Sequence, residues 1–124
     1  MANRFRQGQA AERLAAQYLE GLGYRIVACN VRVGRCGELD LIAYEGETLV
    51  FVEVKARSSA RFGLPEESLT GRKRRRLYRA AQMYLHQQGI VDVPCRFDVV
   101  AIDLGATPPE IRLYRNAFGS EEAL

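Results

Sequence analysis

Two adjacent apolar segments, residues 38–45 and 48–57, constrain the fold most strongly. The Gly46-Glu47 pair between them fits a two-residue hairpin turn of type II′, in which glycine takes the first position. In the resulting hairpin, one face is wholly apolar and half of the other face is apolar as well. A hairpin that is apolar on both faces is buried on both, which predicts a sheet that is covered by helices.

The remaining segments predict the order of elements around this hairpin. Apolar residues recur at helical spacing over residues 6–22 and again from Thr70 to Gln88. Residues 58–69 form a polar loop between the hairpin and the second helix. Three further strands are predicted at residues 24–33, 96–104 and 110–114. The order α-β-β-β-α-β-β predicts an α/β fold, with a mixed β-sheet flanked by helices.

The composition indicates an ordinary globular protein. A length of 124 residues suits one domain, which we expect to span residues 1–118, followed by a short frayed tail at 119–124. The apolar runs are far shorter than the ~20 residues that cross a bilayer, and the polar N-terminal segment resembles no signal peptide. We therefore expect no membrane partner and a cytoplasmic location. The three cysteines lack metal-ligand spacing and are interpreted as buried free thiols.

The register of the hairpin brings several charged residues together at the end away from the turn. It places Asp40 opposite Glu53, and next to them it places Glu38 opposite Lys55. Two carboxylate charges about 5 Å apart repel by roughly 3 kcal/mol at an effective dielectric constant of about 20. A divalent cation would offset this repulsion, because Mg²⁺ is commonly held by one or two carboxylates. The alternative is a surface patch in which Glu38 pairs with Lys55 and Asp40 is solvated.

Lysine is rare among the basic residues of this chain. Of the 18 basic residues, 16 are arginine, and only Lys55 and Lys73 are lysine. The two side chains are not interchangeable, so each lysine indicates a role that arginine does not fill. Lys55 points to the same side of the sheet as Glu53, where it is placed to orient or activate a metal-bound water.

The second predicted helix begins with a concentration of positive charge. Residues 71–79 hold six of the 18 basic residues and no acidic ones, so the rest of the chain has 12 basic against 15 acidic residues, a net charge of −3. Positive side chains are unfavourable at the start of a helix, because the helix dipole is positive there as well. A phosphate group, in contrast, would be bound both by the helix N-terminus and by the basic side chains. The alternatives are a solvated basic face and a face paired with acidic residues of a dimer. The residues predicted to contact nucleic acid are Arg57, Arg61, Arg72, Lys73, Arg74, Arg75, Arg76 and Arg79.

Asp40, followed after the hairpin by Glu53-Val54-Lys55, resembles the PD-(D/E)xK signature of the restriction-endonuclease-like nucleases. Leu39 stands where that signature has proline, as is common in its resolvase-like branches. The resemblance extends to the flanking segments, which look like those of the YraN-type bacterial family, itself similar to archaeal Holliday junction resolvases. The matching segments are residues 8–12, 37–43, 51–57, 62–65 ahead of Lys73, and 96–100.

The resemblance implies a Mg²⁺- or Mn²⁺-dependent endonuclease that acts on DNA, with branched or junction DNA as one substrate class. It implies that Asp40, Glu53 and the backbone carbonyl of Val54 hold the metal. Lys55 would then position the attacking water. Resolvase relatives act as dimers, so a homodimer is one expected assembly.

Two further glutamates complete the candidate catalytic set. Glu12 on the first helix matches a glutamate that joins the site in the resolvase relatives; alternatively, it is a solvated helix residue. Glu38 is interpreted as a further ligand or as a partner for Lys55. Two other functions stay open at this point. One is a non-catalytic nucleic-acid-binding module of the same fold, and the other is an assembly or interaction protein.

Overall fold

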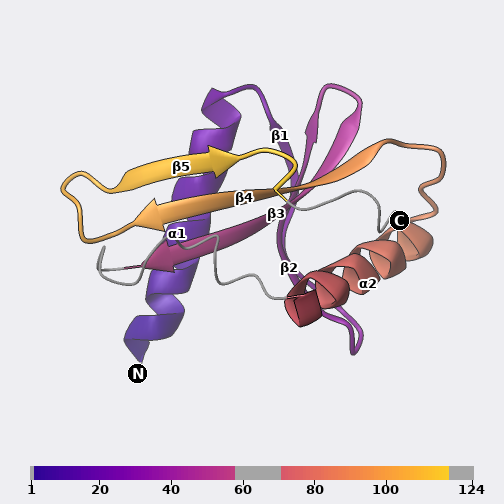
Figure 1. Cartoon of the computed structure of the whole chain (residues 1–124), viewed down its shortest axis with the longest axis horizontal. Helices are drawn as coiled ribbons and strands as arrows, with labels where there is room; N and C mark the ends of the chain where they lie inside the picture. Colours follow the sequence, from indigo (N-terminus) through magenta and orange to yellow (C-terminus); the bar gives the residue numbers. More distant parts are fainter. Residues whose placement is uncertain (1, 58–70, 118–124) are drawn as a thin grey trace.

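The structure is a computed structural model that describes residues 2–57 and 71–117, and of residues 2–7 only the backbone. Figure 1 shows the elements, whose order is the predicted one. The helices and strands are α1 (Ala2–Gly21), β1 (Arg25–Val33), β2 (Gly37–Glu45), β3 (Thr48–Arg57), α2 (Gly71–Gln88), β4 (Cys95–Asp103) and β5 (Glu110–Tyr114). The largest difference from the expected boundaries is at α1, which begins at Ala2 rather than near residue 6. The expected tail at 119–124 lies outside the described residues.

The five strands form one mixed sheet in the order β1-β2-β3-β4-β5. Strands β3 and β4 are parallel, and every other neighbouring pair is antiparallel. A parallel pair requires a crossover connection, and α2 lies within it. The predicted α/β fold with a mixed sheet is confirmed.

The two helices cover opposite faces of this sheet. Figure 1 shows α1 running across the strands behind the sheet, with α2 near β2. From α1, Ala11, Ala15 and Leu19 are buried at a spacing of four residues, so that they form one stripe against the sheet. From α2, the buried residues that pack on the other face are Leu77, Tyr78, Ala80, Ala81 and Tyr84. Neither described helix is both long and apolar enough to span a membrane.

The predicted hairpin turn is confirmed. Gly46 has a φ of 60°, and Glu47 is not among the residues with positive φ, as a type II′ turn requires. The register next to the turn also agrees with the prediction, because Leu41 pairs with Val52 and the pairing continues regularly to the turn.

The expected register is wrong at the charged end of the hairpin. The regular β2–β3 pairing ends at Leu41 and Val52, so Asp40 is not a backbone partner of Glu53. Instead, the Asp40 carboxylate accepts a hydrogen bond from the Val54 backbone N–H at 2.9 Å. The same irregularity moves Leu39 to the α2 face, whereas Leu41 stays on the α1 face.

The neighbouring strand changes at the same point. Asn30 of β1 has a φ of 52°, and it lies where Asp40 would be its partner in the β1–β2 register. Both strands therefore depart from regular geometry together. This local bend explains why the strict alternation of faces, which the sequence pattern assumes, fails at Leu39 and Asp40.

The three cysteines are free, but they are not all buried as we expected. Cys36 and Cys95 are partly buried, and Cys29 is exposed. Cys29 lies on β1, an edge strand of the sheet, where several side chains face solvent.

A buried acidic residue links three segments of the chain, at Tyr24, Arg96 and Asn116. Asp98 on β4 is 0% exposed. Its carboxylate accepts hydrogen bonds from the Tyr24 hydroxyl at 2.8 Å, the Arg96 guanidinium at 2.9 Å and the Asn116 backbone N–H at 2.9 Å. Arg96 also pairs with Glu45. A buried charge is tolerated when it is paired and hydrogen-bonded in this way.

We predict that Asp98→Ala lowers the free energy of unfolding by about 3–5 kcal/mol, because it leaves the partly buried Arg96 without its main partner. Urea denaturation followed by circular dichroism measures the change. Glu110→Ala, which removes one partner of an exposed ion pair with Arg112, is the control and should leave the unfolding midpoint unchanged. Equal midpoints for both variants would contradict a structural role for Asp98.

Candidate functional site

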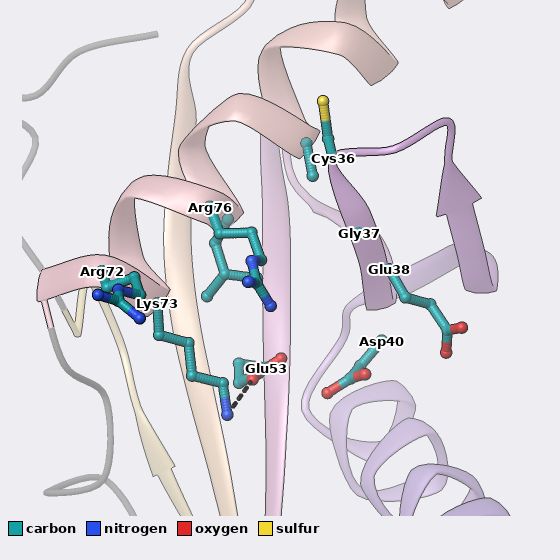
Figure 2. A pocket seen from close by; sticks show the side chains of 10 residues that line it. Cys36, Gly37, Glu38, Asp40, Glu53, Arg72, Lys73 and Arg76 are labelled. Atoms are coloured by element: carbon teal, nitrogen blue, oxygen red, sulfur yellow. Dashed lines mark ion pairs between the residues drawn. The ribbon is translucent and has the colours of Figure 1, made fainter.

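The candidate site is a pocket of about 280 Å³ between the start of α2 and strands β2 and β3. Three carboxylate side chains, those of Glu38, Asp40 and Glu53, line it from the sheet. Three basic side chains line it from α2, and Figure 2 shows them facing the carboxylates across the pocket. These basic residues are Arg72, Lys73 and Arg76.

The topology accounts for this opposition of charges. Phe51 packs on the α2 face of the sheet, and Glu53, two residues further along β3, lies on the same face. The crossover that the parallel β3–β4 pair requires brings the start of α2 back over this face. The first turn of α2 carries no acidic residue, so the sheet-borne carboxylates meet only positive charge there.

Both lysines of the chain contact the same carboxylate oxygen. Lys55 Nζ and Lys73 Nζ each lie 3.6 Å from Glu53 Oε2. Glu53 itself is only 8% exposed. A buried carboxylate charge is unfavourable unless a positive group lies close to it, so the two lysines reduce the cost of burying Glu53. Burial and the nearby Lys73 together lower the pKa of the Lys55 ammonium.

The Asp40 carboxyl has the most strongly perturbed pKa of the site. Its pKa is raised to about 8, first by burial and then by the negative charge of Glu53 and a side-chain hydrogen bond with Glu53. The hydrogen bond from the Val54 N–H opposes this shift without cancelling it. The two carboxyl groups are therefore close neighbours, although they are not paired through the backbone.

Glu12 of α1 joins the same group of carboxylates. Its pKa is raised by burial and by the charges of Glu38 and Glu53, while side-chain hydrogen bonds with Asn30 and Asp40 lower it. The structure therefore places the partly buried Glu12 beside Asp40. Glu38 is exposed and lines the pocket. In the part of the chain that the structure describes, Lys55 pairs with Glu53 and not with Glu38.

Only some of the residues of the predicted basic surface line the pocket. Arg72, Lys73 and Arg76 line the pocket, whereas Arg74, Arg75 and Arg79 are exposed elsewhere on α2. The guanidinium of Arg57 donates a hydrogen bond to the backbone carbonyl of Ala56 at 2.9 Å. Arg61 lies outside the described residues.

Sequence reasoning missed two contributions to the site. Lys73 was assigned to phosphate binding along the helix, yet it reaches the Glu53 carboxylate. Its rarity as one of two lysines was the available signal. The second is Asn30, whose side chain is hydrogen-bonded to Glu12. Nothing in the sequence indicated this role, because the distinguishing feature of Asn30 is its positive φ, which is seen only in the structure.

The donor set of the site suits a hard divalent cation. Asp40 and Glu53 offer carboxylate oxygens side by side, and burial together with the charge of Glu53 raises the pKa of Asp40. Within residues 2–57 and 71–117, no three His, Cys, Asp or Glu side chains are gathered as a metal cage. Mg²⁺ needs no such cage, because one or two carboxylates plus water suffice. Asp40 and Glu53 therefore fit as its ligands.

The raised pKa of Asp40 predicts how stability depends on pH. In EDTA, the folded protein holds the Asp40 proton up to about pH 8, whereas the unfolded chain loses it near its ordinary pKa of 3.8. The free energy of unfolding should therefore fall as the pH rises through this window, by at most about 1.4 kcal/mol per pH unit. Asp40→Asn, which keeps an acceptor for the Val54 N–H, should remove this fall and exceed the wild type in stability at pH 8.

Urea denaturation at several pH values measures the difference between the two proteins. Glu110→Gln, at an exposed carboxylate, serves as the control and should follow the wild type. A wild type and an Asp40→Asn variant with parallel pH profiles would show that Asp40 ionises normally.

The comparisons with known proteins agree on one family. The profile of the uncharacterised protein family UPF0102 matches residues 11–102. A UPF0102 protein of Dehalococcoides mccartyi is 41% identical over 119 residues, which cover 96% of this chain and 98% of the relative. A UPF0102 protein of Symbiobacterium thermophilum is 51% identical over 114 residues, covering 91% and 96%. The resemblance to the YraN-type family is thereby confirmed, and the chain belongs to the UPF0102 family.

Proposed function

We propose that this protein is a metal-dependent nuclease of the PD-(D/E)xK superfamily that hydrolyses phosphodiester bonds in DNA. The observation that carries the proposal is the pocket itself, in which Asp40 and Glu53 face Lys73 and two arginines. Carboxylates bind the cation that the reaction needs, and basic side chains bind the anionic substrate. The two requirements are met on opposite walls of one pocket.

Mg²⁺ or Mn²⁺, when bound by Asp40 and Glu53, would supply Lewis acidity at the phosphodiester and a more acidic water. The residues of the chain do the rest. The Val54 N–H holds Asp40 in place beside Glu53 through its 2.9 Å hydrogen bond. Glu12 supports Asp40 from the side of α1 through a side-chain hydrogen bond, and Asn30 of β1 is hydrogen-bonded to Glu12 in turn.

Lys55 is the group proposed to act on the attacking water. Its ammonium lies 3.6 Å from Glu53 Oε2, and its side chain is only 11% exposed, so its position is well restricted. A compact ammonium with three donors suits this position, because it can bind a carboxylate and a water at once.

The overall reaction is a hydrolysis without any redox step. The water oxygen forms a bond to phosphorus, and one ester P–O bond breaks. The water loses a proton, and the leaving oxygen takes one up. A phosphodiester and water thus give a phosphomonoester and an alcohol.

We predict that the protein cleaves DNA only when Mg²⁺ or Mn²⁺ is present. Fluorescently labelled four-way junction, flap, duplex and single-stranded substrates test this, with EDTA as the negative control. Asp40→Asn and Lys55→Gln should each lower the cleavage rate by about 100-fold or more, since each removes a group that acts on the reacting atoms. Glu110→Gln is the matched charge control and should cut like the wild type.

The same assay separates the alternatives. Tight binding without cleavage by the wild type would favour a non-catalytic nucleic-acid-binding module. Absence of both binding and cleavage at low salt would favour an assembly or interaction protein. Either result would reject the nuclease proposal.

We further predict that DNA binding in EDTA weakens steeply with salt, because the basic wall contacts phosphates. Replacing Arg76 with glutamine should reduce the slope of log Kd against log salt by about one, as expected for the loss of one phosphate contact. Fluorescence anisotropy at several salt concentrations measures the slope. An unchanged slope for Arg76→Gln, with Arg112→Gln as control, would remove Arg76 from the proposed interface.

A further inference from the structure

The two lysines that share Glu53 differ in what else they face. Lys73 lines the pocket, and its side chain is 40% exposed, whereas Lys55 is 11% exposed and is not one of the lining residues. Figure 2 shows Lys73 extending from α2 to Glu53 along one wall of the pocket. An anion that enters this pocket therefore meets Lys73 first.

The contact between Lys73 and Glu53 is an ion pair rather than a tight hydrogen bond. Its length of 3.6 Å exceeds the 2.7–3.2 Å of an ordinary N–H···O hydrogen bond. An ammonium has three N–H donors, so one lysine side chain can contact a carboxylate and a phosphate oxygen at the same time. The α2 wall of the pocket, where Lys73 lies, is lined by basic side chains without an acidic one. An anion is therefore attracted to this wall.

Arg76 and Arg72 define where this anion lies along α2. Both line the pocket, and residues 72, 73 and 76 follow one another on the same side of the first two turns. Arg76 packs directly over Gly37 of β2, since a Cβ at that glycine would lie in van der Waals contact with Arg76 Cδ, at 3.5 Å. Gly37 also has a φ of 126°, which a residue with a side chain rarely adopts. The basic wall is thus fixed from the side of the sheet as well.

We propose that Lys73 is a second catalytic lysine, which binds the non-bridging oxygens of the phosphodiester group that is cut. The inference rests on the proposed nuclease function and deepens it. Lys55 and Lys73 then divide the work: Lys55 acts on the water from within the sheet, and Lys73 stabilises charge on the phosphate from α2. Lys73 transfers no proton, so the balance of the hydrolysis is unchanged.

A purely structural role would make different demands on Lys73. If it only neutralised Glu53, its loss would change stability and the Mg²⁺ concentration needed for cleavage, but it would leave the rate of cleavage of bound DNA at saturating Mg²⁺ intact. If it binds the reacting phosphate, the loss appears in the rate at saturating protein. Single-turnover cleavage separates the two, because it measures affinity and rate independently.

The first experiment compares Lys73→Gln with Arg112→Gln in single-turnover cleavage with Mg²⁺. Arg112 is exposed on β5 and lies outside the proposed site, so its replacement controls for the loss of one positive charge. We expect Lys73→Gln to lower the saturating rate by about 100-fold, as for the loss of one donor to a developing oxyanion. Arg112→Gln should keep the wild-type rate. A Lys73→Gln variant that cuts at the wild-type rate would overturn the proposal.

If Lys73→Gln fails to fold, Lys73→Arg carries the same test, since it keeps the charge. Its planar, bulkier guanidinium should restore DNA affinity while the saturating rate stays at least about 10-fold low. A full wild-type rate in Lys73→Arg would show that only the charge matters, which contradicts a specific contact of the ammonium.

The second experiment needs no catalysis. Reductive ¹³C-methylation labels only Lys55, Lys73 and the N-terminal amine, because the chain has no other lysine. With EDTA present, a short single-stranded oligonucleotide should shift the Lys73 methyl signal more than that of Lys55. A response at Lys55 alone, or at neither lysine when anisotropy shows binding, would refute the contact.

The two experiments keep the failure of this inference apart from that of the nuclease proposal. A wild type that cuts nothing rejects the nuclease, whatever Lys73 does. A wild type that cuts, combined with an active Lys73→Gln variant, rejects only the role of Lys73.

Discussion

The hydrogen bond from the Val54 N–H to the Asp40 carboxylate is the interaction on which the candidate site depends. In a regular hairpin, the backbone of β2 would meet β3 at this point; here a side chain takes that place. The exchange holds Asp40 beside Glu53 in a partly buried position, and the raised pKa of Asp40 is the electrostatic consequence. The strands thus lose part of their pairing where the proposed chemistry takes place.

The sheet topology supplies the other half of the site. Because β3 and β4 are parallel, the chain must cross back over the sheet, and α2 lies in this connection. The basic start of α2, which opposes its own helix dipole, then faces three carboxylates. The carboxylates of β2 and β3 repel one another, and so do the basic side chains of α2. The fold places these two groups on opposite sides of the pocket, with room between them for a cation and a phosphate. The overall charge of +3 conceals this separation.

Much of the fold and part of the site could be predicted from sequence, because both follow from local patterns. The Gly46-Glu47 turn and the apolar alternation predicted the register as far as Leu41 and Val52. The irregularity at Asp40 could not be predicted, since it depends on the left-handed backbone of Asn30 in a neighbouring strand. Lys73 was predicted to lie on the basic helix, but its approach to Glu53 depends on how α2 packs over the sheet.

The central claim is that Asp40 and Glu53 together form a site for a divalent cation. The most direct test is a crystal of the protein soaked in Mn²⁺, with anomalous diffraction recorded at the manganese edge. We expect one strong anomalous peak between the Asp40 and Glu53 carboxylates, which is absent in crystals of Asp40→Asn. A wild-type crystal without a peak there, or with manganese bound only elsewhere, would contradict the claim.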